Sequence, residues 1–249
     1  MRMPLCSIAL GSILMISALV PSNAGQEMGE SNFFTTSDGV RIHYLEKGKG
    51  ETLVFVPGIL FPAEIWEKQI ERFSKEYRVV AMDPRSHGRS ERPTEGHTQS
   101  RRGRDIGELI DHVSDKPVVA IGWSLGVLEI LTFAKENGTD KFKSLVLVDM
   151  FLGFDEKLGT PHPFGNAWIG WMKGLQTDRR KWISDWSRAF HRREHPEEYF
   201  ERMEEALMIT PTNTAVTLLS NLMHIEERDF RPFIDTLDLP VLFVFSSST

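Results

Sequence analysis

The feature that most constrains the fold of this chain is a series of short, largely apolar segments separated by amphipathic stretches. Segments that are apolar at almost every position suit β-strands buried on both faces of a parallel sheet. Between them, apolar residues recur at helical spacing, as in 63–75 and 104–113. This alternation predicts right-handed crossovers and an α/β fold with a doubly wound, mostly parallel sheet. The expected strands are 33–36 and 40–45, which form a hairpin, followed by 53–56, 77–82, 118–121 and 145–148.

The alternation of strand and helix stops at Asp149. The residues after it are rich in Trp, Phe, Met, Arg and Glu and show no clear strand pattern until a helix expected over 230–237 and a strand over 240–245. A helical insertion after the sixth strand accounts for this change. The expected divisions are a core domain over 31–149, a helical cap over 150–226 and the remainder of the core over 227–249.

The N-terminal residues have the composition of an export signal. Arg2 precedes an apolar run over 5–20, and the small residues at 22–24 fit a signal-peptidase cleavage site. We therefore expect 1–24 to be a signal peptide, the protein to be secreted or periplasmic, and no stable membrane insertion after cleavage; a retained membrane anchor is the alternative. Cys6 is the only cysteine and lies in this segment, so the mature chain would have no disulfide, thiol nucleophile or cysteine metal site.

Composition and charge limit the kinds of partner that this chain is expected to bind. The 249 residues are 41% hydrophobic, which suffices for one large core, and the formal net charge of −6 argues against nucleic-acid binding. His191 and His195 match the H-x-x-E-H zinc motif, but Pro196 follows at once and no third ligand is evident, so a solvated helix is expected there. We expect no metal and no cofactor.

One motif carries chemistry. Gly122-Trp123-Ser124-Leu125-Gly126 has the form G-x-S-x-G and stands directly between an expected strand and an expected helix. At such a turn the serine hydroxyl is exposed, the glycines allow sheet and helix to approach closely, and the helix N-terminus favours developing negative charge. The motif therefore predicts that Ser124 is a nucleophile.

With this motif in place, the sequence resembles the α/β-hydrolase family, in its branch of serine esterases and non-heme haloperoxidase-like enzymes. The resemblance covers roughly 33–245 and is more specific for fold than for substrate. The further segments that carry it are Asp38-Gly39-Val40-Arg41-Ile42-His43-Tyr44, Val56-Pro57-Gly58-Ile59 and Asp83-Pro84-Arg85-Ser86-His87-Gly88-Arg89-Ser90.

The resemblance implies an oxyanion hole formed by the backbone N–H groups of Leu125 and Ile59. Pro57 stands where the family usually has histidine, which leaves the Ile59 donor in place; a plain turn at Pro57 is the alternative. Haloalkane dehalogenases and epoxide hydrolases of the family carry aspartate where this chain has Ser124, so their chemistry is disfavoured.

The family's catalytic acid and histidine usually follow its seventh and eighth strands. Here the expected seventh strand, 241–245, is followed by four residues, so we expect the last strand and helix of the fold to be missing and this polypeptide alone to be inactive or unstable. Three explanations for the missing end are open: the sequence is a fragment of a longer gene product, the gene is prematurely stopped, or the protein is a non-catalytic descendant of the family. Asp149 is the candidate acid, with a turn-fixing role as the alternative; the histidines at other positions are each expected to lie away from Ser124.

The expected cap is rich in aromatic residues. Trp123, Trp168 and Trp171 are candidates for contacts with an apolar acyl group, although helical spacing also favours packing between cap helices. The predicted function is hydrolysis of an ester or similar acyl bond of a small molecule through an acyl-enzyme on Ser124. Perhydrolase activity and non-catalytic ligand binding or signalling on the same scaffold are the alternatives; the oligomeric state is not predicted.

Overall fold

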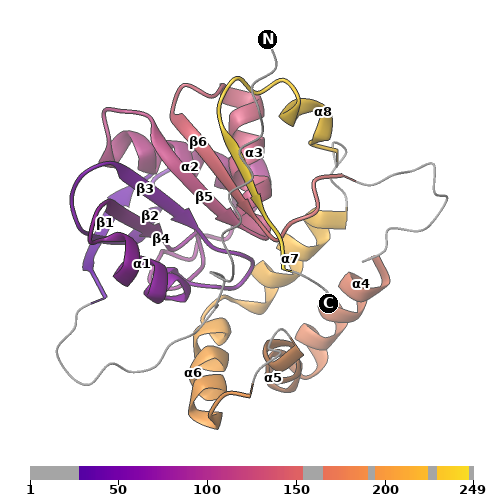
Figure 1. Ribbon diagram of the computed structural model, residues 1–249. Helices are drawn as coiled ribbons and strands as arrows, with labels where there is room; N and C mark the ends of the chain where they lie inside the picture. The colour runs from indigo at the N-terminus through magenta and orange to yellow at the C-terminus, as the bar shows by residue number, and fades with distance from the viewer. Residues whose placement is uncertain (1–27, 154–164, 190–193, 224–228, 247–249) are drawn as a thin grey trace.

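The computed structural model describes residues 28–153, 165–189, 194–223 and 229–246. Within these residues the chain forms one seven-stranded sheet with the strand order β1-β2-β4-β3-β5-β6-β7 (Figure 1). β2 pairs antiparallel with β1 and with β4, and every other pairing is parallel. The strands are β1 (Glu30–Thr35), β2 (Arg41–Lys47), β3 (Thr52–Val56), β4 (Arg78–Met82), β5 (Val118–Trp123), β6 (Phe142–Val148) and β7 (Val241–Val244).

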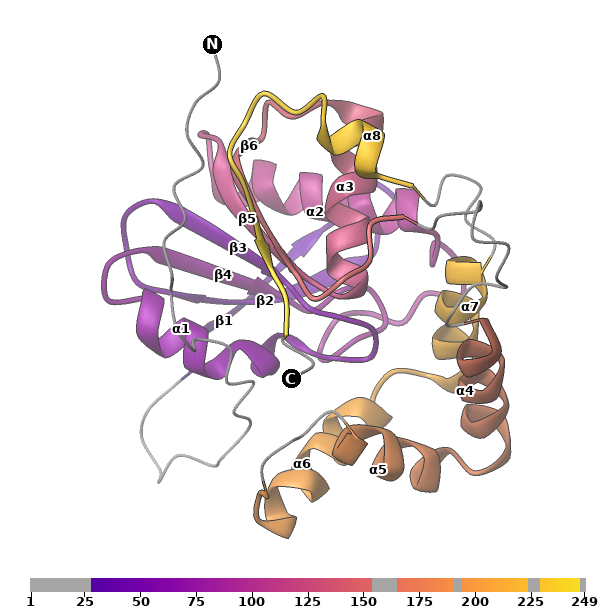
Figure 2. The ribbon, with the colours of Figure 1, turned by 45° about the vertical axis from the view of Figure 1, so that its right-hand side comes forward.

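The central strands are buried because helices cover both faces of the sheet. Every residue of β3 is buried, as its largely apolar sequence predicts. α2 (Gln99–Val113) and α3 (Leu125–Asn137) pack against each other on one face, and η1 (Ala63–Trp66) with α1 (Glu67–Phe73) lies on the other (Figure 2). The predicted doubly wound α/β fold is therefore confirmed.

Of the five described helices between β6 and β7, the first four form one group, and α8 (Arg231–Ile234) follows them. These four stand at the end of the sheet toward which β5, β6 and β7 point (Figures 1 and 2). In parallel α/β sheets this carboxyl end of the strands is where ligands bind. The four helices are α4 (Gly165–Thr177), α5 (Arg179–Ala189), α6 (Glu197–Met208) and α7 (Thr212–Met223).

The last described elements differ from expectation in length. The helix expected over 230–237 ends earlier, as α8 (Arg231–Ile234), because turn hydrogen bonds from the N–H groups of Thr236 and Leu237 close it.

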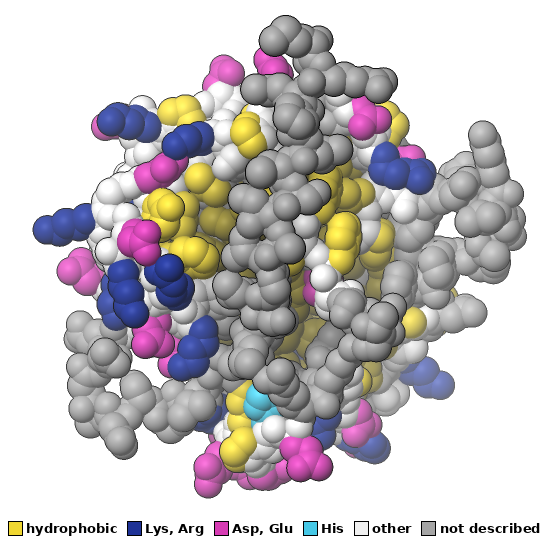
Figure 3. Space-filling model, in the orientation of Figure 1, with side chains coloured by type: hydrophobic (Ala, Val, Ile, Leu, Met, Phe, Trp, Pro, Cys, Tyr) yellow, Lys and Arg dark blue, Asp and Glu magenta, His cyan; other side chains and the backbone are white. Residues whose placement is uncertain are grey.

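β7 pairs with β6 at the edge of the sheet, and Leu242 and Phe245 are 58% and 64% exposed. Hydrophobic side chains gather near the middle of the face that Figure 3 shows. None of the described helices is long and apolar enough to cross a bilayer.

Candidate active site

Ser124 occupies a strained turn between β5 and α3. Its backbone has φ +51° and ψ −122°, a region that residues other than glycine rarely adopt and that costs about 1–3 kcal/mol. Two hydrogen bonds of 2.9 Å hold it: the Ser124 N–H donates to the Val148 carbonyl, and the Val127 N–H donates to the Ser124 carbonyl. Ser124 is half-buried and stands at the carboxyl end of β5.

Two glycines bring the neighbouring chain segments against this turn. A Cβ at Gly126 would lie 2.6 Å from the Val56 carbonyl oxygen and 2.8 Å from that of Pro57, so only glycine lets α3 start this close to the end of β3. A Cβ at Gly58 would lie 3.1 Å from the Ser124 Cβ. The loop that follows β3 is therefore in direct contact with the expected nucleophile.

The two expected oxyanion donors flank Ser124 on these segments. Leu125 is the first residue of α3, where a backbone N–H has no partner within its own helix. Ile59 follows Gly58, where an added Cβ would lie 3.1 Å from the Ser124 Cβ. Among the hydrogen bonds of the described residues, neither N–H donates to another group.

An aromatic series joins the core to the cap beside this turn. The Trp123 ring lies 4.8 Å from Phe61 and 6.5 Å from Trp66, between ring centroids, and Phe61 lies 5.8 Å from Trp186 of α5. Trp186 in turn stacks on Trp182 at 5.2 Å. Sequence reasoning did not name Phe61 as a site residue, although Phe61 stands only two positions after Ile59; it placed Trp186 among the aromatic residues of the cap, some of which were expected to line an acyl pocket.

The other two expected substrate contacts are packed within the cap. Trp171 lies 6.1 Å from Trp182 and 6.0 Å from Trp186, ring to ring. Trp168 is buried and lies 5.8 Å from Phe151. Both side chains thus pack against other aromatic rings, and their contact with substrate stays a prediction.

Asp149, the candidate acid, begins the segment after β6 with φ +47°. Its N–H donates to the Val244 carbonyl at 2.8 Å, and its Oδ1 accepts the Ser246 N–H at 2.6 Å. The side chain thus ties the ends of β6 and β7 together, as a turn-fixing residue does.

The described histidines have other partners. His112 stacks on Phe34, His195 stacks on Tyr199, and the ring of His97 lies 2.9 Å from the Ser86 hydroxyl. Within the described part of the chain, no histidine ring is hydrogen-bonded to Ser124. His162, His191 and His224 lie outside the described residues, as do the first three residues of the H-x-x-E-H motif. The residues described contain no group of three potential metal ligands.

One histidine forms an unexpected Ser-His-Asp chain remote from the G-x-S-x-G turn. His43 Nδ1 lies 2.8 Å from Asp83 Oδ2, and His43 Nε2 lies 2.9 Å from the Ser31 hydroxyl. The His43 ring is fully buried, whereas Ser31 is exposed on β1. Sequence reasoning missed this arrangement, because Ser31 stands alone before the hairpin with no motif around it.

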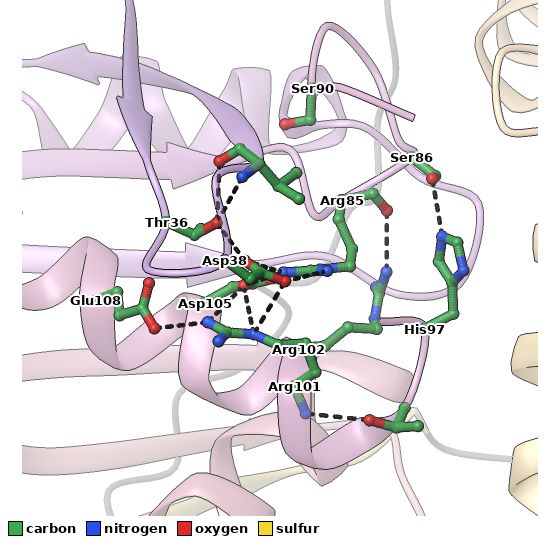
Figure 4. A network of polar contacts seen from close by, with 12 residues as sticks. Thr36, Asp38, Arg85, Ser86, Ser90, His97, Arg101, Arg102, Asp105 and Glu108 are labelled. Atoms are coloured by element: carbon green, nitrogen blue, oxygen red, sulfur yellow. Dashed lines mark hydrogen bonds and ion pairs between the residues drawn. The ribbon is translucent and has the colours of Figure 1, made fainter. Parts of the chain in front are cut away.

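A network of buried charges supports the loop after β4 (Figure 4). Arg85 pairs with Asp105 of α2 at 2.6 Å and with Asp38 of the hairpin turn at 3.0 Å, while Arg102 pairs with Glu129 of α3. Burial alone would raise the pKa of Asp38, but hydrogen bonds from Arg85 and Thr36 lower this pKa to about 2. The loop is thereby anchored to the hairpin and to both helices behind the sheet.

Comparisons with known proteins agree with this fold. The family model of the alpha/beta hydrolase fold matches residues 51–194, more than half of the chain, and the chain belongs to this family. The family and fold predicted from the sequence are therefore confirmed.

Several similar proteins are enzymes by name. A non-heme haloperoxidase of Rhodococcus erythropolis is 31% identical over 117 residues, 47% of this chain and 43% of the relative. A bifunctional esterase/perhydrolase of Acinetobacter calcoaceticus is 31% identical over 119 residues, again 47% and 43% of the two chains. The chain thus spans less than half the length of these two relatives.

Solved structures share the fold. An esterase from Exiguobacterium antarcticum superposes with a TM-score of 0.77 at 20% identity, covering 86% of this chain and 80% of the esterase. A bromoperoxidase from Bacillus anthracis gives a TM-score of 0.77 at 19% identity, with 87% and 81% covered.

Proposed function

We propose that this chain carries the nucleophilic site of a serine hydrolase that cleaves an ester or similar acyl bond of a small molecule. The observation that carries the proposal is the backbone of Ser124, held at φ +51° between β5 and α3, with the neighbouring loop so close that a Cβ added at Gly58 would lie 3.1 Å from the Ser124 Cβ. A strained serine of this kind persists only when the surrounding structure enforces it, and strain of this kind clusters at functional sites.

The chemistry follows from the groups around the serine. A general base removes the proton from the Ser124 hydroxyl, and its oxygen attacks the carbonyl carbon of the substrate. The Leu125 and Ile59 N–H groups donate to the oxyanion that develops, and the start of α3 adds a favourable field. The bond to the leaving alcohol then breaks as this group takes up the proton. Water attacks the acyl-enzyme in the same manner and releases the acid.

The general base is proposed to come from residues that the structure does not describe. The histidines that it does describe contact other groups. Asp149 remains a proposed acid, although its Oδ1 already accepts the Ser246 N–H. A serine hydroxyl without a base is a poor nucleophile, so turnover depends on the residue that supplies this base.

The acyl group of the substrate is proposed to be apolar. Trp123 and Phe61 lie in contact beside Ser124, and Trp186 brings the cap onto Phe61. Aromatic surfaces of this kind bind apolar groups and exclude water from the site. No residue that the structure describes points to an organic cofactor.

Hydrolysis of p-nitrophenyl esters with acyl chains of increasing length tests the proposal. The chain is assayed as it stands, with added imidazole as an external base, and extended through any coding sequence that follows it. Ser124→Ala is expected to lower kcat by at least about 10³-fold in the active form, since losing a nucleophile costs up to ~10⁶-fold. Ser31→Ala is the matched control and should leave kcat unchanged. Full activity in the Ser124→Ala variant would exclude the proposed mechanism.

Perhydrolase activity is a second candidate, favoured by the haloperoxidase and esterase/perhydrolase relatives. In that reaction hydrogen peroxide replaces water as the attacker of the acyl-enzyme and yields a peracid. Halogenation of monochlorodimedone that requires both peroxide and a carboxylate would support it. Halogenation that continues in Ser124→Ala would exclude a reaction through this serine.

Export of the protein is also a proposal. Residues 1–24 lie outside the described residues, so the composition of this segment is its only support. N-terminal sequencing of the protein recovered from the periplasm or medium should begin at Gly25. Recovery of an uncleaved chain in the membrane fraction would instead indicate a retained anchor.

A further inference from the structure

Two side chains of the loop after β4 hold the segment that carries Ile59: Asp83 accepts the Ala63 N–H at 2.6 Å, and His87 contacts Leu60. His87 is fully buried, and its two ring nitrogens both contact backbone groups. Nε2 lies 3.0 Å from the Leu60 nitrogen, whose N–H donates to it, and Nδ1 lies 3.0 Å from the Arg85 carbonyl oxygen. Because an N–H can only donate and a carbonyl can only accept, the ring must be neutral and must carry its proton on Nδ1.

The group that His87 holds belongs to a strained turn. The Phe61 N–H donates to the Gly58 carbonyl at 3.2 Å and closes a four-residue turn in which Leu60 has φ +70°. Turns with positive φ at the third position normally place glycine or asparagine there. This conformation is sterically unfavourable for leucine, so a contact from outside the turn is needed to hold Leu60 in it.

His87 is the contact that selects this conformation. The Leu60 N–H points to the His87 ring, which fixes the orientation of the peptide group between Ile59 and Leu60. If that peptide flipped, Leu60 would leave the strained region, but a carbonyl oxygen would then face the lone pair of Nε2. The neutral ring therefore favours the strained turn and disfavours its relaxed alternative.

We propose that His87 is a positioning residue for the oxyanion hole, acting through the Leu60 N–H to hold the turn that presents the Ile59 N–H beside Ser124. The inference rests on the proposed function, because Ile59 matters only if an oxyanion develops there. His87 itself does not touch the reacting atoms.

The surroundings of His87 keep its ring neutral. Burial lowers the pKa of His87 well below its usual value, and the positive charge of Arg102 lowers this pKa further. The Arg102 Nη1 donates to the same Arg85 carbonyl that accepts the His87 N–H, at 3.1 Å. The buried charge network of α2 and α3 thus reaches the oxyanion loop through one backbone carbonyl and one imidazole.

Three variants test the role of the ring. His87→Phe keeps a ring of similar size but removes the acceptor, and His87→Gln replaces the ring with an amide that can still accept the Leu60 N–H. His112→Gln changes a histidine on an exposed position of α2 and serves as the control. Circular dichroism establishes that each variant folds.

The first readout is hydrogen–deuterium exchange of the Leu60 amide, which does not depend on activity. Exchange should be at least about 10-fold faster in His87→Phe than in the parent chain, with His87→Gln intermediate and His112→Gln unchanged. Unchanged exchange in His87→Phe would overturn the proposal.

The second readout is ester hydrolysis in the form of the chain that proves active. Because loss of an oxyanion donor costs about 10²–10³ in kcat, a misplaced donor in His87→Phe should lower kcat roughly 10- to 100-fold with little change in KM, and His87→Gln should recover part of it. Faster exchange with normal kcat would overturn the positioning role while the serine mechanism stands. If Ser124→Ala retains activity, the proposed function fails first, and the role of His87 in it fails as well.

Discussion

Replacing Gly126 by alanine tests whether the turn at Ser124 depends on a close approach between α3 and β3. The new Cβ would lie 2.6 Å from the Val56 carbonyl oxygen and 2.8 Å from that of Pro57. Both contacts are with backbone, which cannot rotate away as a side chain can. The shorter contact must lengthen by about 0.8 Å to reach an ordinary 3.4 Å, so either α3 or the end of β3 has to move.

The expected change in the free energy of unfolding of Gly126→Ala follows from two opposing effects. Alanine is favoured over glycine inside a helix by at most about 1 kcal/mol. Overpacking in a well-packed region costs typically 1–3 kcal/mol. Gly126→Ala should therefore lower the free energy of unfolding by up to about 2 kcal/mol. Gly170 of α4 is the matched control, since a Cβ added there would meet no neighbouring group within 4 Å, and Gly170→Ala should raise this free energy by up to about 1 kcal/mol.

Urea unfolding followed by circular dichroism measures both variants against the parent chain, with equal m-values as the test that only stability has changed. Labelling of Ser124 should also slow in Gly126→Ala, because the displaced Val56–Pro57 segment leads into the loop of Ile59. If Gly126→Ala unfolds at the same or a higher urea concentration than the parent, α3 and β3 do not approach as closely as this account requires.

Three further predictions concern the charge network and the cap. Burial and the charges of Arg102 and Arg85 lower the pKa of His97 to about 4. Because histidine in the unfolded chain has a pKa near 6.5, the unfolded chain binds more protons than the folded one between about pH 6.5 and 4. The free energy of unfolding should therefore fall by up to roughly 3 kcal/mol as the pH is lowered over this range. Urea unfolding across this range should show a smaller fall in His97→Gln, and an equal fall would exclude His97 as the cause. Glu129→Gln should lower the free energy of unfolding by about 3–5 kcal/mol, because it leaves the buried Arg102 charge unpaired. Glu76→Gln, in an exposed ion pair, should lower this free energy by under about 1 kcal/mol. Equal urea midpoints for the two variants would contradict the buried position of the Arg102–Glu129 pair. Trp186→Ala should raise KM for long-chain esters more than for acetate esters, and an equal effect on both would remove Trp186 from the acyl site.

The sequence was sufficient for the features that depend on local pattern. Largely apolar segments such as β3 identified the parallel sheet, and the glycines around Ser124 identified a strand–turn–helix junction. The hydrophobic period and the steric demand of a tight turn both act over a few neighbouring residues, so they can be read directly. The end of α8 was misplaced because its turn hydrogen bonds leave no such pattern.

Contacts between distant segments could not be read in this way. The bond between Leu60 and His87, the approach of Phe61 to Trp186 and the chain from Ser31 through His43 join residues that the fold brings together. Each of these contacts depends on how the strands are ordered in the sheet, and no residue type or spacing in the sequence predicts it. The buried charges of Arg85 and Arg102 were equally hidden, because arginine in a helix or loop normally indicates solvent.

The central claim is that Ser124 is the nucleophile, and the most direct test is to locate the adduct of a fluorophosphonate probe by peptide mass spectrometry. The chain is labelled alone, with imidazole, and extended through any downstream coding sequence. We expect the adduct on the peptide that contains Ser124, and no adduct in Ser124→Ala, while Ser31→Ala labels as the parent does. An adduct on Ser31, or folded protein that remains unlabelled in all three conditions, would contradict the account.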